Sequence, residues 1–283
     1  MTAVVLGAGG MLARALEQEL PAARHLRIED CDITDPEQVA RAIVPGVSVV
    51  YNAAADTRVD LAESDPAHLS VNEAAVGVVA ARCREVGALF VHVSTDYVFD
   101  GRGTRPYRES DPVDPVNAYG RGKLAGETRA LSSGAEVVIV RTSWLFGPLG
   151  PSFPEAILKQ AEEGKKELRV VADQTGRPTA TADLAAALHR LVTCGARGVV
   201  HFANSGETTW WELAREVLLA AGHTDVIVRP CTSAEFPRPA RRPVYSVLDT
   251  ALYERLAGER PRPWRATVTD FVAQRAAAQA VRG

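Results

Sequence analysis

Short apolar runs alternate with amphipathic stretches along the first half of the chain. The apolar runs predict strands at residues 2–6, 25–28, 47–51, 88–93 and 137–140. The stretches between them predict helices at residues 11–20, 36–43, 69–86 and 119–131. Because the strands are short and mostly apolar on both faces, the pattern predicts an α/β fold: a Rossmann-like doubly wound parallel sheet with helices on both sides.

The alternation becomes less regular after residue 147. Further helices are predicted at residues 153–163, 181–192, 210–221 and 264–277, and short strands at 199–202 and 226–228. Residues 229–243 are rich in proline and arginine and predict an ordered loop. We therefore expect a dinucleotide-binding domain at residues 1–147, onto which parts of later segments fold back. Residues 148–283 are expected to form a smaller C-terminal substrate-binding cap.

Composition excludes several classes of protein. The 283 residues carry a net charge of −3, which does not favour nucleic acid or an anionic membrane as a partner. There is no apolar run of about 18 residues, and the first residues lack the basic region of a signal peptide. Four cysteines and six histidines lack metal-ligand spacing, which indicates reduced thiols and no metal site. We expect a cytoplasmic protein.

A glycine-rich turn joins the first predicted strand to the first predicted helix. Gly7 permits the tight turn, and Gly10 lets the backbone approach a pyrophosphate. Met11 and Leu12 begin the helix whose N-terminal amides face the anion. Because this turn opens a strand–helix–strand pattern, it predicts a nicotinamide dinucleotide site.

The second predicted strand leaves the choice of dinucleotide open. Glu29 and Asp30 are candidates for the acid that reads the adenosine ribose. No arginine follows this strand at an obvious 2′-phosphate position, so NADH and NADPH both remain open. Asp32 and Ile33 are expected against the adenine, and the alternative is a turn that caps the next helix.

Tyr119 and Lys123 form a YxxxK pair, which a helix places on one face, one turn apart. An ammonium there is expected to lower the pKa of the phenol from about 10 towards neutral pH, which suits proton transfer. Ser94 and Thr95 come where the fourth strand ends, so that either hydroxyl would bond a substrate carbonyl.

Small residues after the third strand, at positions 53–55, would let the backbone approach the dinucleotide. Asn72 has two interpretations, as a structural residue or as one that orients a water molecule beside the lysine. The sequence alone does not decide between them.

These motifs resemble the extended short-chain dehydrogenase/reductases and, within them, the dTDP-4-dehydrorhamnose reductase family. The resemblance covers nearly the whole chain. It rests on GAGGMLA (7–13), NAAADT (52–57), STDYVFDG (94–101), YGRGKLAGE (119–127), RTSWLFG (141–147) and DQTGRPT (173–179).

The resemblance implies that NADPH or NADH reduces the C4 ketone of a dTDP-linked 4-keto-6-deoxysugar, with Thr95, Tyr119 and Lys123 as the catalytic group. The cofactor would lie along Gly7, Gly10, Met11, Leu12, Asp32, Ile33, Ala54, Ala55, Asp56, Thr57, Tyr119 and Lys123. The sugar nucleotide would contact Thr95, Asp96 and Trp144. Asp173, Gln174 and residues 177–179 would form part of the pocket floor, and residues 241–243 either a loop near the nucleotide or a solvated loop.

One departure concerns a metal. Some relatives place a first-helix glutamate in a dimer-bridging Mg²⁺ site, and the corresponding residue here is Ala15. The resemblance therefore does not carry over Mg²⁺, and it leaves a homodimer open.

Two other functions remain open at this point. The substrate of a reductase would equally be an antibiotic-pathway dTDP-deoxysugar such as a streptose. A protein of another class, a non-catalytic dinucleotide-binding regulatory subunit like the β subunit of methionine adenosyltransferase, would not need the intact Thr95, Tyr119 and Lys123. A 4,6-dehydratase is disfavoured, because Tyr97 follows Asp96 where an Asp-Glu pair is expected.

Overall fold

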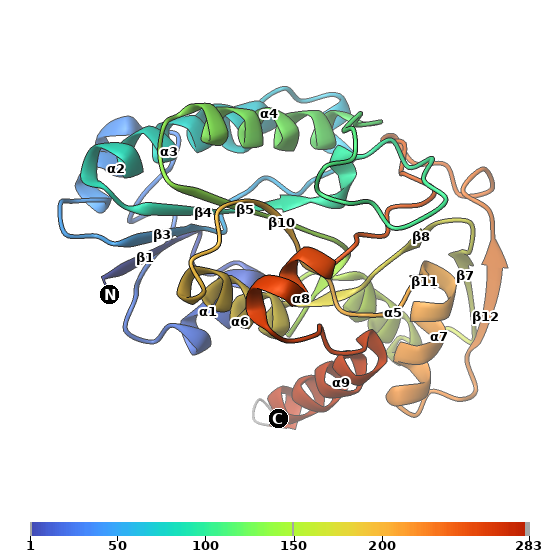
Figure 1. Cartoon of the computed structure of the whole chain (residues 1–283). Coiled ribbons are helices and arrows are strands. Elements are labelled where there is room, and N and C mark those ends of the chain that lie inside the picture. Colours follow the sequence, from blue (N-terminus) through green and yellow to red (C-terminus); the bar gives the residue numbers. More distant parts are fainter. Residues whose placement is uncertain (1, 149, 281–283) are drawn as a thin grey trace.

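The computed structural model describes residues 2–148 and 150–280, and a six-stranded parallel sheet forms its centre (Figure 1). In spatial order the strands are β2 (Arg24–Leu26), β1 (Ala3–Leu6), β3 (Val49–Asn52), β4 (Leu89–Thr95), β5 (Val137–Thr142) and β10 (Gly198–His201). The chain order reverses at β1, which lies between β2 and β3, and open α/β sheets bind ligands beside such a reversal. The predicted Rossmann-like fold is confirmed.

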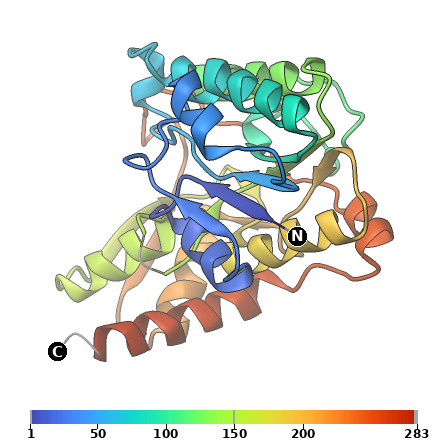
Figure 2. The ribbon, with the colours of Figure 1, turned by 90° about the vertical axis from the view of Figure 1, so that its left-hand side faces the viewer.

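Helices cover both faces of the sheet (Figures 1 and 2). One layer consists of α2 (Pro36–Ala42), α3 (Ala75–Val86) and α4 (Ala118–Ser132). The other consists of α1 (Met11–Glu19), α6 (Thr181–Thr193) and α8 (Ala251–Ala257). Successive strand residues point to opposite faces, so Val4 and Phe90 pack under the first layer while Val5 and Val91 pack under the second. Each face thus has its own apolar core.

A third apolar core lies beside the carboxyl ends of the strands. It is built from α5 (Phe153–Glu162), α7 (Trp210–Ala220) and α9 (Trp264–Ala280), with β6 (Leu145–Phe146), β7 (Glu167–Val171), β9 (Thr179–Ala180) and β12 (Ile227–Cys231). A short ribbon pairs β8 (Thr175–Gly176) with β11 (Thr208–Thr209). The later half of the chain also supplies β10 and α6 to the central sheet and its cover. The division at residue 147 stays a prediction.

One local expectation is wrong, and a second is refined by the structure. β12 continues to Cys231, so the first residues of the predicted loop at 229–243 form a strand that pairs in parallel with β7. Its Pro230 is tolerated because β12 is an edge strand of a two-stranded sheet. The predicted helix at residues 69–86 is helical throughout, but it contains a π-helical segment, η2 (Ser70–Ala74), directly before α3. Such turns often occur where a side chain serves a site.

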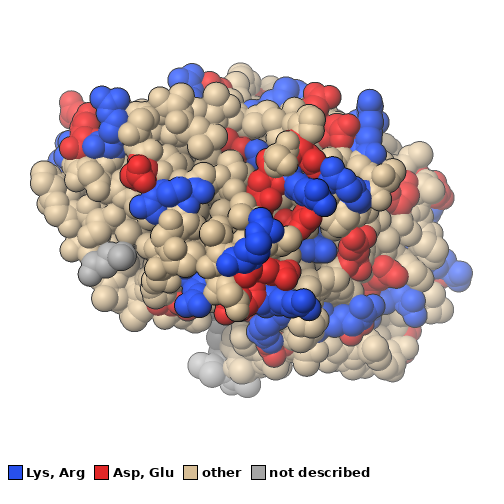
Figure 3. Space-filling model, viewed as in Figure 1, with Lys and Arg blue, Asp and Glu red and all other residues tan. Residues whose placement is uncertain are grey.

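Other local expectations are confirmed. Asp35 caps α2, since its side chain accepts hydrogen bonds from the backbone N–H groups of Glu37 and Gln38, and Pro36 occupies the first turn. Among the helices of the described chain, none is both long and apolar enough to cross a membrane. Acidic and basic side chains are interspersed over the face shown in Figure 3.

Candidate active site

A cleft of about 510 Å³ lies at the carboxyl ends of the strands of the central sheet. Segments that follow β1, β3, β4 and β5 line it, together with Pro151, which precedes α5, and Trp210, which begins α7. The cleft brings together many of the predicted site residues: Gly10, Met11, Leu12, Ala54, Ala55, Thr57, Thr95, Asp96, Tyr119, Lys123 and Trp144. Residues far apart in the sequence thus share one cavity.

The glycine turn at the start of α1 fits a dinucleotide pyrophosphate. Gly7 has a φ of +87°, and a Cβ there would lie 2.6 Å from the backbone nitrogen of Ala54. Gly10 is the N-cap of α1 and offers no side chain to the first N–H groups of the helix, whereas Asn117 caps α4. Because Gly10 and Met11 line the cleft, these uncapped amides are available to an anion.

Four predicted cofactor residues do not line this cleft: Gly7, Asp32, Ile33 and Asp56. Ile33 is buried in the core under α2. The carboxylate of Asp32 accepts hydrogen bonds from the backbone N–H and the hydroxyl of Thr34, at 2.9 and 2.7 Å. This is the turn that the sequence left as the alternative, and the roles of Asp32 and Ile33 towards an adenine stay predictions.

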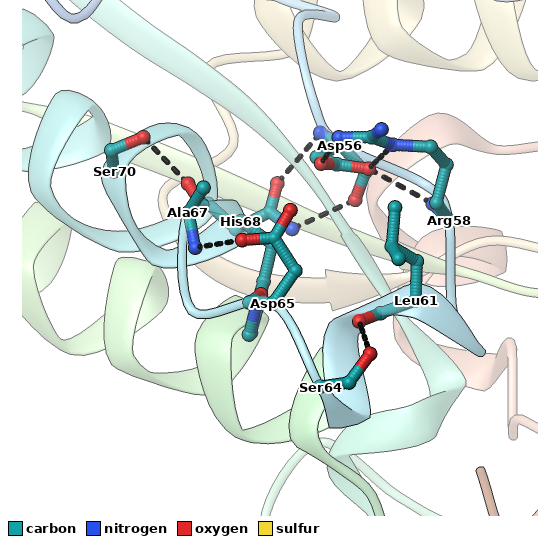
Figure 4. Close-up of polar contacts among 9 residues, drawn as sticks. Asp56, Arg58, Leu61, Ser64, Asp65, Ala67, His68 and Ser70 are labelled. Atoms are coloured by element: carbon teal, nitrogen blue, oxygen red, sulfur yellow. Dashed lines mark hydrogen bonds and ion pairs between the residues drawn. The ribbon is translucent and has the colours of Figure 1, made fainter. Parts of the chain in front are cut away.

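Asp56 and the loop after it are held by polar contacts. Arg58 donates two side-chain hydrogen bonds to Asp56, which hold the pKa of that carboxyl below its ordinary value (Figure 4). Asn72, from η2, donates to the carbonyl oxygen of Asp56 at 2.8 Å and accepts from its N–H at 3.0 Å. Asn72 is therefore a structural residue that fixes the 54–57 segment beside the cleft.

The end of β2 differs from the sequence-based expectation. The strand ends at Leu26, whose carbonyl oxygen accepts hydrogen bonds from the N–H groups of Gly7 and Ala8. Arg27 is therefore the first residue after the strand, next to the glycine turn, and it is exposed. The predicted strand at residues 25–28 contained Arg27, whereas β2 ends before it, so an arginine does follow the observed strand. Asp30, also exposed, accepts a hydrogen bond from the N–H of Arg27.

The helix that carries the YxxxK pair is positioned by close backbone contact. Its first turn packs against η3 (Asp96–Val98), and a Cβ at Gly120 would lie 2.2 Å from the carbonyl oxygen of Tyr97. Only glycine permits this approach, which sets the ring of Tyr119 edge-on to that of Tyr97 with the centroids 5.9 Å apart. Tyr119 and Lys123 both reach the cleft, as predicted.

The charge state of the pair differs from the expectation. Burial raises the pKa of Tyr119 above its ordinary value, the charge of Asp96 adds to the rise, and a hydrogen bond with Thr95 opposes it. The Nζ of Lys123 lies instead 2.7 Å from the carbonyl oxygen of Val93 and 3.3 Å from Nε2 of His92, so burial and not the lysine sets the direction of the shift. Burial lowers the pKa of Lys123 to about 8. Tyr119 consequently keeps its proton at neutral pH, as a general acid must.

Ser94 and Thr95 have different surroundings. The hydroxyl of Ser94 donates to the buried carboxylate of Glu127 at 2.5 Å, and that carboxylate also pairs with Arg141 at 2.7 Å. Thr95 lies near enough to Tyr119 to lower the pKa of the phenol, and its hydroxyl donates to Asp96 at 3.1 Å. Of the two hydroxyls that the sequence left open, that of Thr95 adjoins the phenol.

Asp96 is a buried acid in the wall of the cleft. It is 2% exposed, and burial raises its pKa to about 7. Ser246 lies near enough to the carboxyl to oppose that rise, but its hydroxyl does not reach hydrogen-bond geometry, so Oδ2 has no close partner within the described residues. A buried polar atom without a partner is unfavourable, so Asp96 fits a hydroxyl-bearing ligand.

Two tryptophans form an aromatic wall. Trp144 lines the cleft as predicted and stacks on Trp210, which no sequence motif had indicated. Trp144 has a φ of +46°, an unusual conformation for a bulky residue, and Gly176 lies so close to it that a Cβ would sit 2.4 Å from its ring. Gln174 of the predicted pocket floor accepts a hydrogen bond from the indole N–H of Trp210.

Ala53, expected with its neighbours to let the backbone approach the dinucleotide, also lines the cleft, whereas further lining residues were missed: Ala13, Val59, Val93, Tyr97, Thr142, Ser143, Leu145 and Pro151. They come from loops and strand ends whose proximity depends on tertiary packing. At the predicted nucleotide loop, Arg242 pairs with Asp60. Ala15, where the resemblance implied a departure from a metal ligand, packs against the core under α1. Within residues 2–148 and 150–280, no three His, Cys, Asp or Glu side chains group as a metal site would need.

Comparisons with known proteins agree with this geometry. Residues 1–277 match the family described as RmlD substrate binding domain. The chain is 42% identical over 281 residues to the dTDP-4-dehydrorhamnose reductase of Mycolicibacterium smegmatis, covering 95% of this chain and 84% of that one. It is 40% identical to the dTDP-4-keto-6-deoxy-D-glucose reductase of Streptomyces niveus, covering 94% of both chains. A structure of dTDP-4-dehydrorhamnose reductase from Bacillus anthracis in complex with NADP superimposes with a TM-score of 0.91 at 32% identity, covering 97% of this chain and 100% of that one.

Proposed function

This chain belongs to the RmlD substrate binding domain family, and we propose on that basis that it is a reductase dependent on a nicotinamide dinucleotide. Its substrate is the C4 ketone of a dTDP-linked 4-keto-6-deoxysugar, the class that the names of its relatives share. One observation carries the proposal: a single cleft is lined by Thr95, Tyr119 and Lys123 and also by the first turn of α1, whose N–H groups have no side-chain cap. A non-catalytic regulatory subunit has no need of this arrangement.

The residues of the cleft divide into two groups. Gly10, Met11 and Leu12 would hold the pyrophosphate through the first amides of α1. When bound, the reduced nicotinamide supplies the hydride for the ketone carbon. Thr95 holds the carbonyl oxygen by a hydrogen bond, and Tyr119 donates its proton to that oxygen as the alcohol forms. The high pKa of Tyr119 keeps it protonated until the oxygen becomes basic.

The other side of the cleft suits the sugar. Asp96 offers an oxygen without a partner to a sugar hydroxyl. The stacked rings of Trp144 and Trp210 offer an apolar face to the deoxysugar ring and its C6 methyl group. An antibiotic-pathway deoxysugar with the same ketone is a second candidate of the same class, supported by the similarity to the Streptomyces niveus reductase.

For the dinucleotide we favour NADPH. Arg27 directly follows β2 and adjoins the glycine turn, where an arginine accommodates the 2′-phosphate of NADPH in this type of fold. The related Bacillus anthracis structure is described as a complex with NADP. The homodimer, the absence of Mg²⁺ and the cytoplasmic location stay predictions.

A substrate panel tests the function. The purified protein is incubated with dTDP- and UDP-linked 4-keto-6-deoxysugars, each with NADPH and with NADH, and the loss of reduced nicotinamide absorbance is followed. We expect turnover of at least one dTDP-linked ketone, faster with NADPH. Dinucleotide binding without turnover of any ketone would favour the regulatory subunit instead.

A further inference from the structure

Behind the cleft, a chain of hydrogen bonds joins the backbone of Ala54 to the side chain of Lys123. The N–H of Ala54 donates to Oδ1 of Asn52 at 3.1 Å, and Nδ2 of Asn52 lies 3.2 Å from Nδ1 of His92. Nε2 of His92 lies 3.3 Å from Nζ of Lys123. The parallel pairing of β3 with β4 sets Asn52 opposite His92. The three side chains are buried, so each depends on protein partners.

The anchoring of Asn52 decides which nitrogen of His92 carries the proton. Because Oδ1 of Asn52 accepts the Ala54 N–H, the group that faces His92 is the amide nitrogen Nδ2, which only donates. Nδ1 of His92 must then accept. Burial and the charge of Lys123 hold the pKa of His92 well below its ordinary value, so the ring is neutral and its single proton lies on Nε2.

Lys123 therefore faces a donor at His92 and an acceptor at the carbonyl oxygen of Val93, which lies 2.7 Å from Nζ. A neutral amine satisfies both, because it has a lone pair as well as N–H groups. An ammonium has only donors and leaves the Nε2–H of His92 without an acceptor. We propose that His92 is a positioning residue for the reduction, which favours the neutral amine of Lys123 by presenting an N–H donor to Nζ.

Other charged groups near the lysine do not replace His92 in this role. Burial is the largest influence on the pKa of Lys123, and Glu127, one turn along α4, opposes it. The carboxylate of Glu127 is already paired with an arginine of β5. Asp56 and Asp96, from the segments after β3 and β4, act on the phenol of the catalytic tyrosine. His92, from β4, is the titratable side chain that contacts Nζ among the described residues.

The proposal rests on the proposed function only in that Lys123 serves the reduction. Ala54 lines the cleft at one end of the chain of bonds, and Lys123 lines it at the other. The backbone segment predicted to lie along the dinucleotide is thereby linked to the proton on the lysine.

Histidine NMR tests the tautomer in the wild-type protein. Long-range ¹⁵N–¹H spectra of ¹⁵N-histidine-labelled protein, recorded without dinucleotide or substrate, show which ring nitrogen is protonated in each of the six histidines. We expect His92, assigned from backbone spectra, to stay neutral with its proton on Nε2 between about pH 6 and pH 9. A proton on Nδ1 of His92 would overturn the proposal, and no variant is needed.

Lysine NMR tests the expected effect of His92 on the pKa of Lys123. The chain has four lysines, and the other three, Lys159, Lys165 and Lys166, are exposed internal references. We expect an Nζ titration to give Lys123 a pKa of about 8. In His92→Gln, the amide can turn its oxygen towards Nζ and accept from the ammonium, which should raise the pKa of Lys123 by about one.

A matched variant controls for packing. His201 is also a buried imidazole of the central sheet, on β10, where burial lowers its pKa to about 3. His201→Gln should leave the pKa of Lys123 where it is in the wild type. The proposal would be refuted if the pKa of Lys123 were unchanged in a folded His92→Gln protein, or if it rose equally in both variants.

Turnover provides an independent readout. The limb of the kcat/KM profile that reports the ionisation of Lys123 should move to higher pH in His92→Gln by as much as the pKa of Lys123 moves in the NMR titration. The NMR titrations use no substrate, so they separate the two proposals. If the protein reduces no ketone but the pKa of Lys123 rises in His92→Gln, only the proposed function is contradicted. If the enzyme is active but the pKa of Lys123 does not change in His92→Gln, only this inference is contradicted.

Discussion

The indole rings of Trp144 and Trp210 stack with their centroids 3.6 Å apart and their planes 10° from parallel. One ring comes from the turn after β5 and the other from the first residue of α7. The pair thus joins the central sheet to the third core at the cleft. Any ligand that packs on Trp144 depends on Trp210 for the position of that ring.

Trp210→Ala should weaken the use of the sugar nucleotide more than the binding of the dinucleotide. Loss of the stacked ring leaves Trp144 free to move, and an apolar contact of this kind typically contributes about 10–200-fold to kcat/KM. Sugar-nucleotide kinetics and NADPH fluorescence titration measure the two effects. Trp211→Ala is the control, because its indole bonds to Val228 outside the cleft. Equal kinetic losses in both variants would mean that Trp210 is only part of the core.

Tyr119→Phe should lower kcat by about 10²–10⁴-fold, because it removes the proton donor. The dissociation constant of NADPH should change little. Tyr51→Phe, in the core under α1, controls for the loss of a buried tyrosine hydroxyl and should retain turnover. Near-normal turnover of Tyr119→Phe would exclude this tyrosine as the acid.

Arg27→Gln should raise the KM for NADPH by about 10–100-fold and leave that for NADH nearly unchanged, because only NADPH carries a phosphate for the guanidinium to bind. The NADPH effect should shrink at high ionic strength, since Arg27 is exposed. Arg24→Gln, at the other end of β2, serves as the control. If Arg27→Gln weakens both dinucleotides equally, Arg27 does not read the 2′-phosphate.

Asp96→Asn should change how stability depends on pH. Burial raises the pKa of Asp96 to about 7, so the folded state holds a proton that the unfolded state releases near pH 4. The stabilisation is complete below about pH 4 and is lost as pH rises to about 7, a change on the order of 4 kcal/mol. Urea unfolding from pH 4 to pH 8 should show Asp96→Asn gaining stability relative to the wild type as pH rises. Parallel curves for the two proteins would contradict this.

Arg141→Met should lower the free energy of unfolding by about 3–5 kcal/mol, because the buried carboxylate of Glu127 loses its counterion. Urea denaturation near pH 7 measures the effect. The double variant with Glu127→Leu should recover most of the loss, since no unpaired charge is left. A double variant no more stable than Arg141→Met would show that packing around the arginine, and not its charge, supports the fold.

The sequence by itself determined those features that depend on neighbours along the chain. The alternation of apolar and polar positions predicted the doubly wound sheet, and the glycine turn and the YxxxK spacing predicted two faces of one cleft. The N-cap at Asp35 followed from a local hydrogen bond. Such features need only the geometry of a single strand, turn or helix, which the adjacent residues set.

Only the tertiary structure decided the features that depend on burial and on contacts between distant segments. The sequence could not show that Trp210 stacks on Trp144, or that β2 ends at Leu26 and leaves Arg27 as the first residue after the strand. It also predicted a lowered pKa for Tyr119, whereas desolvation raises it and the lysine bonds elsewhere. The physical reason is that the pKa of a buried group and the position of a buried ring depend on the groups that pack around them. Those groups come from distant parts of the chain, so the local spacing of residues does not reveal them.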